Sequence, residues 1–368
     1  MTNGQEDILA LFGVPGVGAK TFSRLVGRFG SPAAVFMASD RDLLDVKGVG
    51  PVLLGNIRGH DRISFLRKQK RLMDKVGAVL LTRGEPGYPP FLDAFTSAPP
   101  VLFVRGDPEA LSLPSLAFVG TRHPSPWGVS MTAKLVAGTA SAGFCTVSGM
   151  AAGIDSAAHI AAIENGGRTV AVFGCGVDII YPSENRRLAE EIRKNGCLVS
   201  HFLMGAVCSP GNFPARNALI VGLSLATVVV EAPKRSGALI TADLTLRARR
   251  PLFAVPGNAD SPASEGTNAL LGQGALPVSR LEDILRRLNR PVPQTRMSDP
   301  GEAPRAAGRQ PPPGLGGRII GALGQGPLQI ETLCARLDTP AASLLTELTL
   351  LEMDGYIRQR PGKFFENV

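Results

Sequence analysis

Six short apolar runs, separated by helical patterns, dominate the middle of this sequence. They are LAFVG (116–120), FCTVSG (144–149), TVAVFG (169–174), CLVSHF (197–202), ATVVVEA (226–232) and LFAVPG (252–257). Amphipathic helical patterns lie between them, for example over residues 184–195 and 238–249. Near-continuous apolar strands that alternate with helices indicate a parallel sheet covered on both faces. The predicted fold class is therefore α/β, with a doubly wound parallel sheet over residues 76–288.

The flanking segments follow other patterns. Residues 1–75 are predicted to be all-helical, with two apolar-x-Gly-apolar-Gly turns, GVPGVG (13–18) and VKGVG (46–50). Such turns resemble a helix-hairpin-helix pair, whose backbone N–H groups hold a DNA phosphate, although a small bundle with glycine C-caps has the same pattern. Residues 289–316 are rich in Pro and Gly and are predicted to be a linker. Three short helices (318–323, 330–337, 343–354) and a β-wing (355–367) predict a winged-helix unit over residues 317–368.

The charge distribution suits a nucleic-acid partner, but a net charge of +8 over 368 residues is equally that of an ordinary, modestly basic protein. The chain has 39 Lys+Arg and 31 Asp+Glu, and residues 1–75 hold 12 basic and 7 acidic side chains. Residues 218–230 are the most apolar stretch, which is too short to span a bilayer, so we expect no membrane insertion. The N-terminus lacks the pattern of a signal peptide, and the five cysteines lack paired spacing, so reduced thiols and a cytoplasmic location are predicted.

Glycine-rich turns and basic side chains follow the predicted strands. Because the carboxyl ends of parallel strands share one edge of the sheet, we expect these residues to form one ligand site. An anion-binding turn with Arg or Lys and one aromatic ring is typical of a site for single-stranded nucleic acid. The predicted site residues are Gly120, Thr121, Arg122, Ser148, Gly149, Phe213, Arg216, Asn217, Lys234, Arg235, Ser236 and Gly237.

No cofactor, metal or catalytic residue is predicted. The sequence has neither a G-x-G-x-x-G turn with a ribose-binding acid nor a G-x-x-x-x-G-K-[ST] loop. The histidines His123, His159 and His201 are isolated, and nothing pairs Asp155, Asp178 and Glu231 as an acid–base or metal site. Asp155 is expected to cap the helix that follows Gly153.

Six blocks resemble the DNA-processing protein DprA (Smf) family over about residues 80–285. They are VGTRHPSPWG, SGMAAGIDSAAH, GCGVDIIYPSENRRLAEEI, PGNFPARNALIVGLS, VVVEAPKRSGALITA and FAVPGNADSPASEGTNALL. The resemblance implies a Rossmann-like, non-enzymatic homodimer with sterile-alpha-motif-like and winged-helix flanks. It also implies binding and protection of single-stranded DNA during natural transformation, and loading of a RecA-type recombinase past single-strand-binding protein. The turn at residues 120–122 would face the phosphates, and Phe213, Arg216, Lys234 or Arg235 and residues 236–237 would form the pocket.

Three positions depart from the family pattern. Ala152 and Ala218 stand where the family usually has Arg, and His201 stands where it often has an acidic residue. Each lost arginine is expected to cost about 1 kcal/mol or more of binding free energy if it contacted phosphate. We hypothesise that the basic segment 1–75 compensates for this loss of affinity. The alternative is a nucleoside-monophosphate phosphoribohydrolase-like enzyme, but the turn KRSGALITAD lacks the double glycine and the Glu of those enzymes. Binding of duplex DNA, the dimer surface and the role of the winged unit are left open.

Overall fold

The computed structural model describes residues 1–95, 98–289, 312, 314–324, 326–353, 356–360 and 364–367. The chain forms two compact units, one reaching from Met1 to Pro293 and the other from Gln294 to Val368. Within the described ranges, no helix combines the length and the apolar character needed to cross a membrane.

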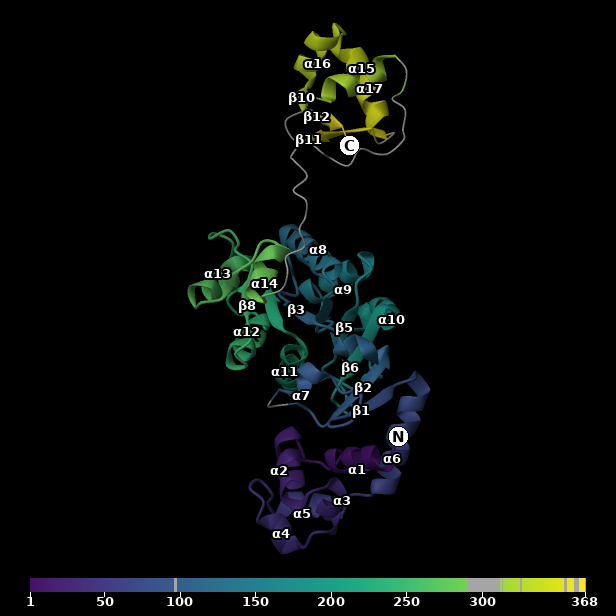
Figure 1. Ribbon diagram of the computed structural model, residues 1–368, viewed down its shortest axis with the longest axis vertical. Coiled ribbons are helices and arrows are strands. Elements are labelled where there is room, and N and C mark those ends of the chain that lie inside the picture. The colour runs from purple at the N-terminus through teal and green to yellow at the C-terminus, as the bar shows by residue number, and fades with distance from the viewer. Residues whose placement is uncertain are drawn as a thin grey trace. The chain divides into compact units, whose positions relative to one another are not determined.

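A nine-stranded sheet forms the centre of the first unit (Figure 1). Its strands are β1 (Val79–Thr82), β2 (Val101–Gly106), β3 (Ser115–Val119), β4 (Cys145–Ser148), β5 (Thr169–Val172), β6 (Gly196–Ser200), β7 (Ala226–Val229), β8 (Leu252–Ala254) and β9 (Leu276–Pro277), in the order β1-β2-β6-β5-β4-β3-β7-β8-β9. Strands β3 to β9 pair in parallel, which confirms the predicted α/β fold. At one end of the sheet, β1 pairs antiparallel with β2 and β2 pairs antiparallel with β6, so the sheet is mixed.

Helices cover both faces of this sheet, which explains why every residue of β3 is buried. On one face, α8 (Pro126–Ser141), α9 (Ile154–Glu164), α10 (Arg186–Asn195) and α14 (Leu281–Arg287) contribute to the packed apolar side chains. On the other face lie α7 (Pro90–Asp93), α11 (Phe213–Leu223), α12 (Ala238–Arg247) and α13 (Glu265–Gly272). The sheet has two apolar layers, and strands between them show no polar alternation.

Six helices precede the sheet, and two of them pack on it. They are α1 (Asn3–Phe12), α2 (Ala19–Phe29), α3 (Pro32–Met37), α4 (Asp40–Leu44), α5 (Pro51–Arg58) and α6 (Arg62–Val76). The two glycine turns precede α2 and α5, as predicted, and Val17 and Val49 of these turns are buried in a small core of their own. In contrast, Leu9 of α1 and Met73 of α6 pack with Phe103 of β2. The first and last helices of the segment therefore share the core of the sheet.

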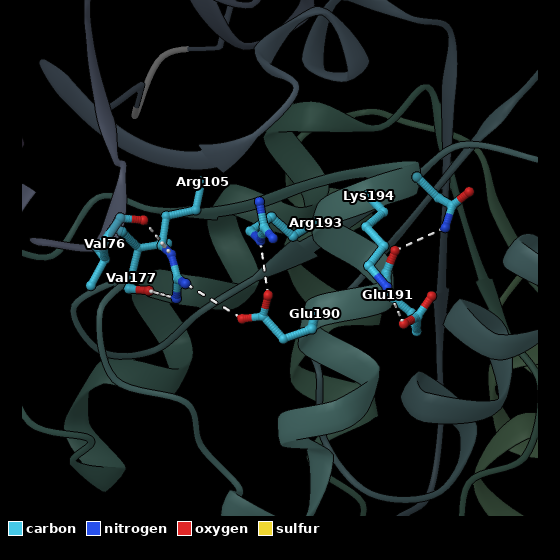
Figure 2. A network of polar contacts seen from close by, with 8 residues as sticks. Val76, Arg105, Val177, Glu190, Glu191, Arg193 and Lys194 are labelled. Carbon is cyan, nitrogen blue, oxygen red and sulfur yellow. Dashed lines mark hydrogen bonds and ion pairs between the residues drawn. The ribbon is translucent and has the colours of Figure 1, made fainter. Parts of the chain in front are cut away.

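Arg105 of β2 ties the C-terminal end of α6 to α10 (Figure 2). It donates to the carbonyl oxygens of Val76 (3.2 Å) and Val177 (3.4 Å) and lies 3.5 Å from the carboxylate of Glu190. Burial lowers the pKa of Arg105, but a cation beside the last carbonyl groups of a helix is favourable. The end of α6 is thus fixed in place.

The second unit is a winged helix. Its elements are α15 (Leu315–Leu323), β10 (Leu328–Gln329), α16 (Ile330–Leu337), α17 (Ala341–Met353), β11 (Ile357–Arg360) and β12 (Phe364–Asn367). The strands pair in the order β10-β12-β11, and Ile319, Leu333 and Leu348 are in its core. The three predicted helices and the wing are confirmed. The linker predicted over residues 289–316 lies almost wholly outside the described residues.

Candidate nucleic-acid interface

The strand order reverses at β3. From β3 the chain passes to β4, β5 and β6 on one side and then to β7, β8 and β9 on the other. Ligands of open α/β sheets bind in the crevice at such a point, beyond the carboxyl ends of the strands. The turn at residues 120–122 follows β3, and the loop at residues 231–237 follows β7. The backbone N–H of Thr121 donates to the carbonyl of Glu231 (2.7 Å), so the two loops are joined at this crevice.

Two cavities lie side by side at the crevice, with volumes of about 500 and about 100 Å³. Both are lined by Arg122, Ala151, Phe213 and Arg216. The predicted residues that line the larger cavity are Gly120, Thr121, Arg122, Phe213, Arg216, Asn217, Arg235, Ser236 and Gly237. Gly149 lines the smaller one.

The other two predicted residues, Ser148 and Lys234, line neither cavity. The hydroxyl of Ser148 is buried and donates to the carbonyl of Phe118 (2.6 Å). The ammonium of Lys234 is exposed and lies 3.4 Å from the carboxylate of Glu265. The Ser148 hydroxyl therefore joins the end of β4 to β3 next to the cavities. Lys234 lies outside the two cavities.

Arg216, in the first turn of α11, is buried with 6% of its surface exposed. Its Nη1 donates to the carbonyl oxygen of Gly149 (2.6 Å) and lies 3.7 Å from Oδ2 of Asp155. Burial lowers the pKa of Arg216. Its Nε is also buried and has no hydrogen-bond partner among the residues that the structure describes. An unsatisfied buried donor is costly, so burial of Arg216 at this position is energetically unfavourable unless its contacts with Gly149 and Asp155 offset it.

Asp155 does not cap α9, contrary to the prediction. Gly153 occupies the N-cap position with φ of +81°, and the chain turns into the helix there. Asp155 consequently lies on the inner face of the first turn, where it accepts from the backbone N–H groups of Gly149 (3.1 Å) and Ala151 (3.4 Å). Burial raises the pKa of Asp155, and the Arg216 guanidinium opposes that rise. The carboxylate holds the loop and Arg216 in position.

Phe213 lies within reach of two guanidinium groups. The Cζ atom of Arg122 is 5.6 Å from the ring centroid of Phe213, and that of Arg216 is 5.5 Å from it. Arg122 is exposed and has no ion pair among the described residues. A half-buried ring beside an exposed cation can stack a base while the cation contacts phosphate.

Two helix N-termini lie at the larger cavity. Phe213 and Ala238 begin α11 and α12 and line this cavity. Neither N-cap residue makes a side-chain hydrogen bond, although the backbone N–H of Ala238 donates to the hydroxyl of Ser236 (3.3 Å). Glu231 stabilises the start of a third helix, α8. Its carboxylate accepts from the backbone N–H (2.8 Å) and the hydroxyl (2.7 Å) of Ser125, the N-cap residue of α8. The positive ends of α11 and α12 favour an anionic ligand.

Comparison with known proteins now decides the family. The sequence model of the family described as "DNA recombination-mediator protein A" matches residues 79–289, more than half of the chain. The chain belongs to this family. The "DprA winged helix domain" matches residues 303–363, and the "SAM-like Helix-hairpin-helix tandem" matches residues 8–58, so both predicted flanking folds are confirmed.

Relatives and solved structures agree with this placement. Protein Smf of Synechocystis is 35% identical over 297 residues, which are 78% of this chain and 74% of the relative. DprA of Streptococcus pneumoniae is 39% identical over 198 residues, 54% of this chain and 70% of that protein. The X-ray structure of the S. pneumoniae DprA superposes with a TM-score of 0.69 at 30% identity, covering 78% of this chain and 98% of that one. A DprA structure from Helicobacter pylori, described as showing a unique single-stranded DNA binding mode, gives 0.52 at 30% identity, covering 58% and 95%.

Some residues of this candidate site were not predicted from the sequence. Cys175, Tyr181, Pro182 and Cys208 line the smaller cavity. Tyr181 is half exposed and follows β5, so its place after a strand of the same edge was a usable signal. The side-chain amide of Asn212 donates to the carbonyl of Gly174 (2.8 Å), which holds the start of α11 against the loop after β5. That contact joins distant segments and has no local sequence signal.

The histidines have different surroundings. His123 is exposed and lines the larger cavity. His159 is buried, and its Nδ1 lies 2.7 Å from the hydroxyl of Thr169, which itself donates to the carbonyl of Thr146 (2.9 Å). Burial lowers the pKa of His159 to about 3. His159 is therefore a neutral core residue.

The departures from the DprA-family pattern lie in different places. Ala152 is exposed and lines the smaller cavity of the site. Ala218 and His201 instead line an apolar cavity of about 480 Å³, together with Phe12, Leu92 and Phe95. On α11, Ala215, Ala218 and Leu219 face this apolar cavity, whereas Phe213, Arg216 and Asn217 face the site. The two missing arginines are therefore not equivalent.

Proposed function

We propose that this DprA-family chain is a single-stranded DNA-binding recombination mediator, which holds the strand in the crevice between β3 and β7. The arrangement of Arg122, Phe213 and Arg216 carries this proposal. The single-stranded DNA binding mode described for the H. pylori DprA supports the choice of ligand.

The chemistry of the crevice suits an unpaired nucleotide. Arg122, Arg235 and the N-termini of α11 and α12 attract phosphate, and Phe213 offers a ring face to a base. A base must leave the duplex stack before it can reach a half-buried ring, which favours single strands over duplexes. Phosphate and ring contacts carry no sequence information, so binding is sequence-tolerant.

A mediator role follows from this kind of binding. A homodimer that holds incoming DNA without reading it protects the strand in the cytoplasm and leaves its base edges available for pairing. It then passes the strand to a RecA-type recombinase in place of single-strand-binding protein, in natural transformation and DNA repair. The family description, which names a recombination mediator, supports this role.

We propose binding without catalysis. Asp155 is the one carboxylate among the described residues that line the two cavities, and its oxygen Oδ2 is bonded to the loop and faces Arg216. A phosphoribohydrolase-like reaction needs a carboxylate at the glycosidic bond, whereas Asp155 is engaged by the loop and by Arg216. Release of free base from AMP by this protein would contradict the proposal.

Fluorescence anisotropy of a labelled oligo-dT and of its duplex across a salt series tests the binding. We expect tight, salt-sensitive binding that prefers the single strand, because each phosphate contact releases counterions. Absence of binding at low salt would contradict the proposal. For the mediator role, the measurement is the rate of recombinase filament growth on a strand coated with single-strand-binding protein, which we expect to rise when the protein is added.

A further inference from the structure

The positive charge of the N-terminal segment is concentrated on one helix. Residues 1–61 contain six basic and six acidic side chains, whereas α6 contains six basic side chains and one acidic one, Asp74. Both hairpin turns thus lie in a stretch with no net charge. The whole basic excess of the segment belongs to α6.

The basic residues of α6 share its exposed face. Arg67, Lys68, Lys70, Arg71 and Lys75 are exposed, and we call these five residues the α6 stripe. The opposite face packs on the sheet, since Gln69 and Met73 are buried and Phe65, Leu66 and Leu72 contact the same core. At a rise of about 1.5 Å per residue, Arg67, Arg71 and Lys75 follow one another at intervals of about 6 Å. These three side chains form a row of cations, and Asp74, also exposed, is the one acidic residue of this helix.

The α6 stripe has no ion pairs within the part of the chain that the structure describes. Elsewhere the same protein neutralises such residues: in α10, Arg193 lies 2.9 Å from Glu190 and Lys194 lies 2.7 Å from Glu191 (Figure 2). Arg67 and Arg71 are like charges four residues apart on one helix, a spacing that generally destabilises the helix. A row of cations kept at that cost fits a polyanionic partner.

The stripe is held beside the loop that ends at Phe213. Gln69, on the buried face of α6, donates to the carbonyl of Met204 (3.4 Å) and accepts from its backbone N–H (2.9 Å). Leu72 packs against Gly205. The chain continues from there through Cys208 and Pro210, which line the two cavities, to Phe213.

The hairpin turns are less suited to phosphate. Gly18 and Ala19 of the first turn line the apolar cavity with Leu92 and Leu219, so this turn faces the α/β part. In the second turn, Arg24 donates to the carbonyl of Lys47 (2.9 Å), so this cation is already engaged by the turn itself. Asp40, Asp42 and Asp45 precede that turn along the chain and oppose an anion there.

We propose that the α6 stripe is a second phosphate-binding surface, which takes the backbone of the same single strand where it leaves the Phe213 crevice. This rests on the proposed single-strand function of the crevice. A lipid surface is the poorer occupant, because the apolar face of α6 is buried in the core and cannot enter a bilayer. The stripe lengthens the DNA footprint and makes affinity depend on strand length.

The test compares two full-length variants that lose the same charge. One is Arg67→Gln/Lys68→Gln/Arg71→Gln; the matched control is Lys134→Gln/Arg286→Gln/Arg287→Gln on α8 and α14, whose three cations are also exposed and without ion pairs among the described residues. These helices are drawn away from α6 in Figure 1. Binding is measured by fluorescence anisotropy across a salt series, with one dT oligonucleotide of about 5 nucleotides and another about six times longer.

We expect the α6 variant to bind the long oligonucleotide at least tenfold more weakly than the wild type at physiological salt. The slope of log K against log salt falls by about 2, since each lost contact to a single strand contributes about 0.7. Binding of the short oligonucleotide and the thermal melting point stay at wild-type values, and the control variant follows the wild type.

Four results would overturn the proposal. Equal losses in the α6 variant and the control would reduce the stripe to a general surface charge. If polyglutamate displaced the long oligonucleotide from the wild type as effectively as unlabelled dT does, the stripe would be assigned to an acidic polypeptide. A wild type that binds neither oligonucleotide would refute the proposed function itself. In contrast, long-strand binding that is lost in Arg122→Gln but unchanged in the α6 variant would refute only the role of α6.

Discussion

The guanidinium of Arg216 donates a 2.6 Å hydrogen bond to the backbone carbonyl of Gly149, which joins the start of α11 to the loop after β4. This approach requires glycine, because a Cβ atom at position 149 would lie 1.3 Å from Nη1 of Arg216 and 2.8 Å from Oδ2 of Asp155. The position of the Arg216 guanidinium beside Phe213 therefore depends on residue 149 having no side chain. Residue 149 follows β4, which is two strands away from β7 in the sheet.

Gly149→Ala is therefore expected to displace Arg216 and to weaken both the fold and the site. We expect a loss of about 1–3 kcal/mol in the free energy of unfolding, measured by urea denaturation, because a buried ion pair and its hydrogen bonds are disturbed. Binding of oligo-dT falls with it. Gly211→Ala is the control, since a Cβ at Gly211 meets only the Ser209 hydroxyl at 3.9 Å. Wild-type stability of Gly149→Ala would show that Arg216 adapts freely.

Arg122 and Phe213 are expected to contribute to binding by different mechanisms. Arg122→Ala removes a phosphate contact and should lower the salt slope by about 0.7. Phe213→Ala removes a stacked base and should cost about 1–3 kcal/mol with the slope nearly unchanged. Anisotropy across a salt series measures both quantities. Because the two side chains are 5.6 Å apart, the double variant will lose less than the sum of the two losses. Equal loss of slope in both single variants would contradict these roles.

Arg216→Gln should make stability strongly dependent on pH. Burial already raises the pKa of Asp155, and loss of the guanidinium raises that pKa further. A carboxyl with a raised pKa binds its proton more tightly in the folded state, so stability falls as pH rises from about 4 through that pKa. We expect a loss of about 3–5 kcal/mol at neutral pH and a smaller one in acid. Urea unfolding from about pH 4 to about pH 8 measures it.

Asp155→Asn in the Arg216→Gln background is the control for this effect. The amide does not titrate, so the added pH dependence should disappear. A double variant that keeps the same pH dependence would assign it to another group.

Much of the fold was predictable because it depends on local patterns. The parallel strands were visible as apolar runs, since both faces of β3 to β8 are buried. The antiparallel strands β1 and β2 were not predicted, although VLFVRG is apolar, because their pairing partners are set by long-range packing. The edge that carries the candidate site could be located from the strand ends, because the strands themselves were visible as apolar runs.

The individual roles within the site were not predictable in this way. Arg216 and Asp155 are far apart in sequence, and only the fold shows that they face each other at 3.7 Å. The sequence pattern suggested an N-cap at Asp155, whereas the positive φ of Gly153 moves the start of α9 and turns Asp155 inward. The basic excess of residues 1–75 was visible, but its location on the exposed face of α6 depends on how that helix packs.

The two alanines that replace family arginines provide the last prediction. Ala152 is exposed at the smaller cavity, beside Arg122 and Tyr181, so an arginine there reaches the site from solvent. Ala218 faces the apolar cavity, where a guanidinium would have to be buried beside Leu92 and Phe95. We expect Ala152→Arg to bind oligo-dT about fivefold more tightly, close to 1 kcal/mol, with a salt slope about 0.7 steeper. Ala218→Arg should leave the slope unchanged and lower the free energy of unfolding by at least about 1 kcal/mol. Anisotropy and urea denaturation measure the two effects, and Ala152→Gln controls for side-chain size. A steeper slope in Ala218→Arg would place the DNA path along the other face of α11.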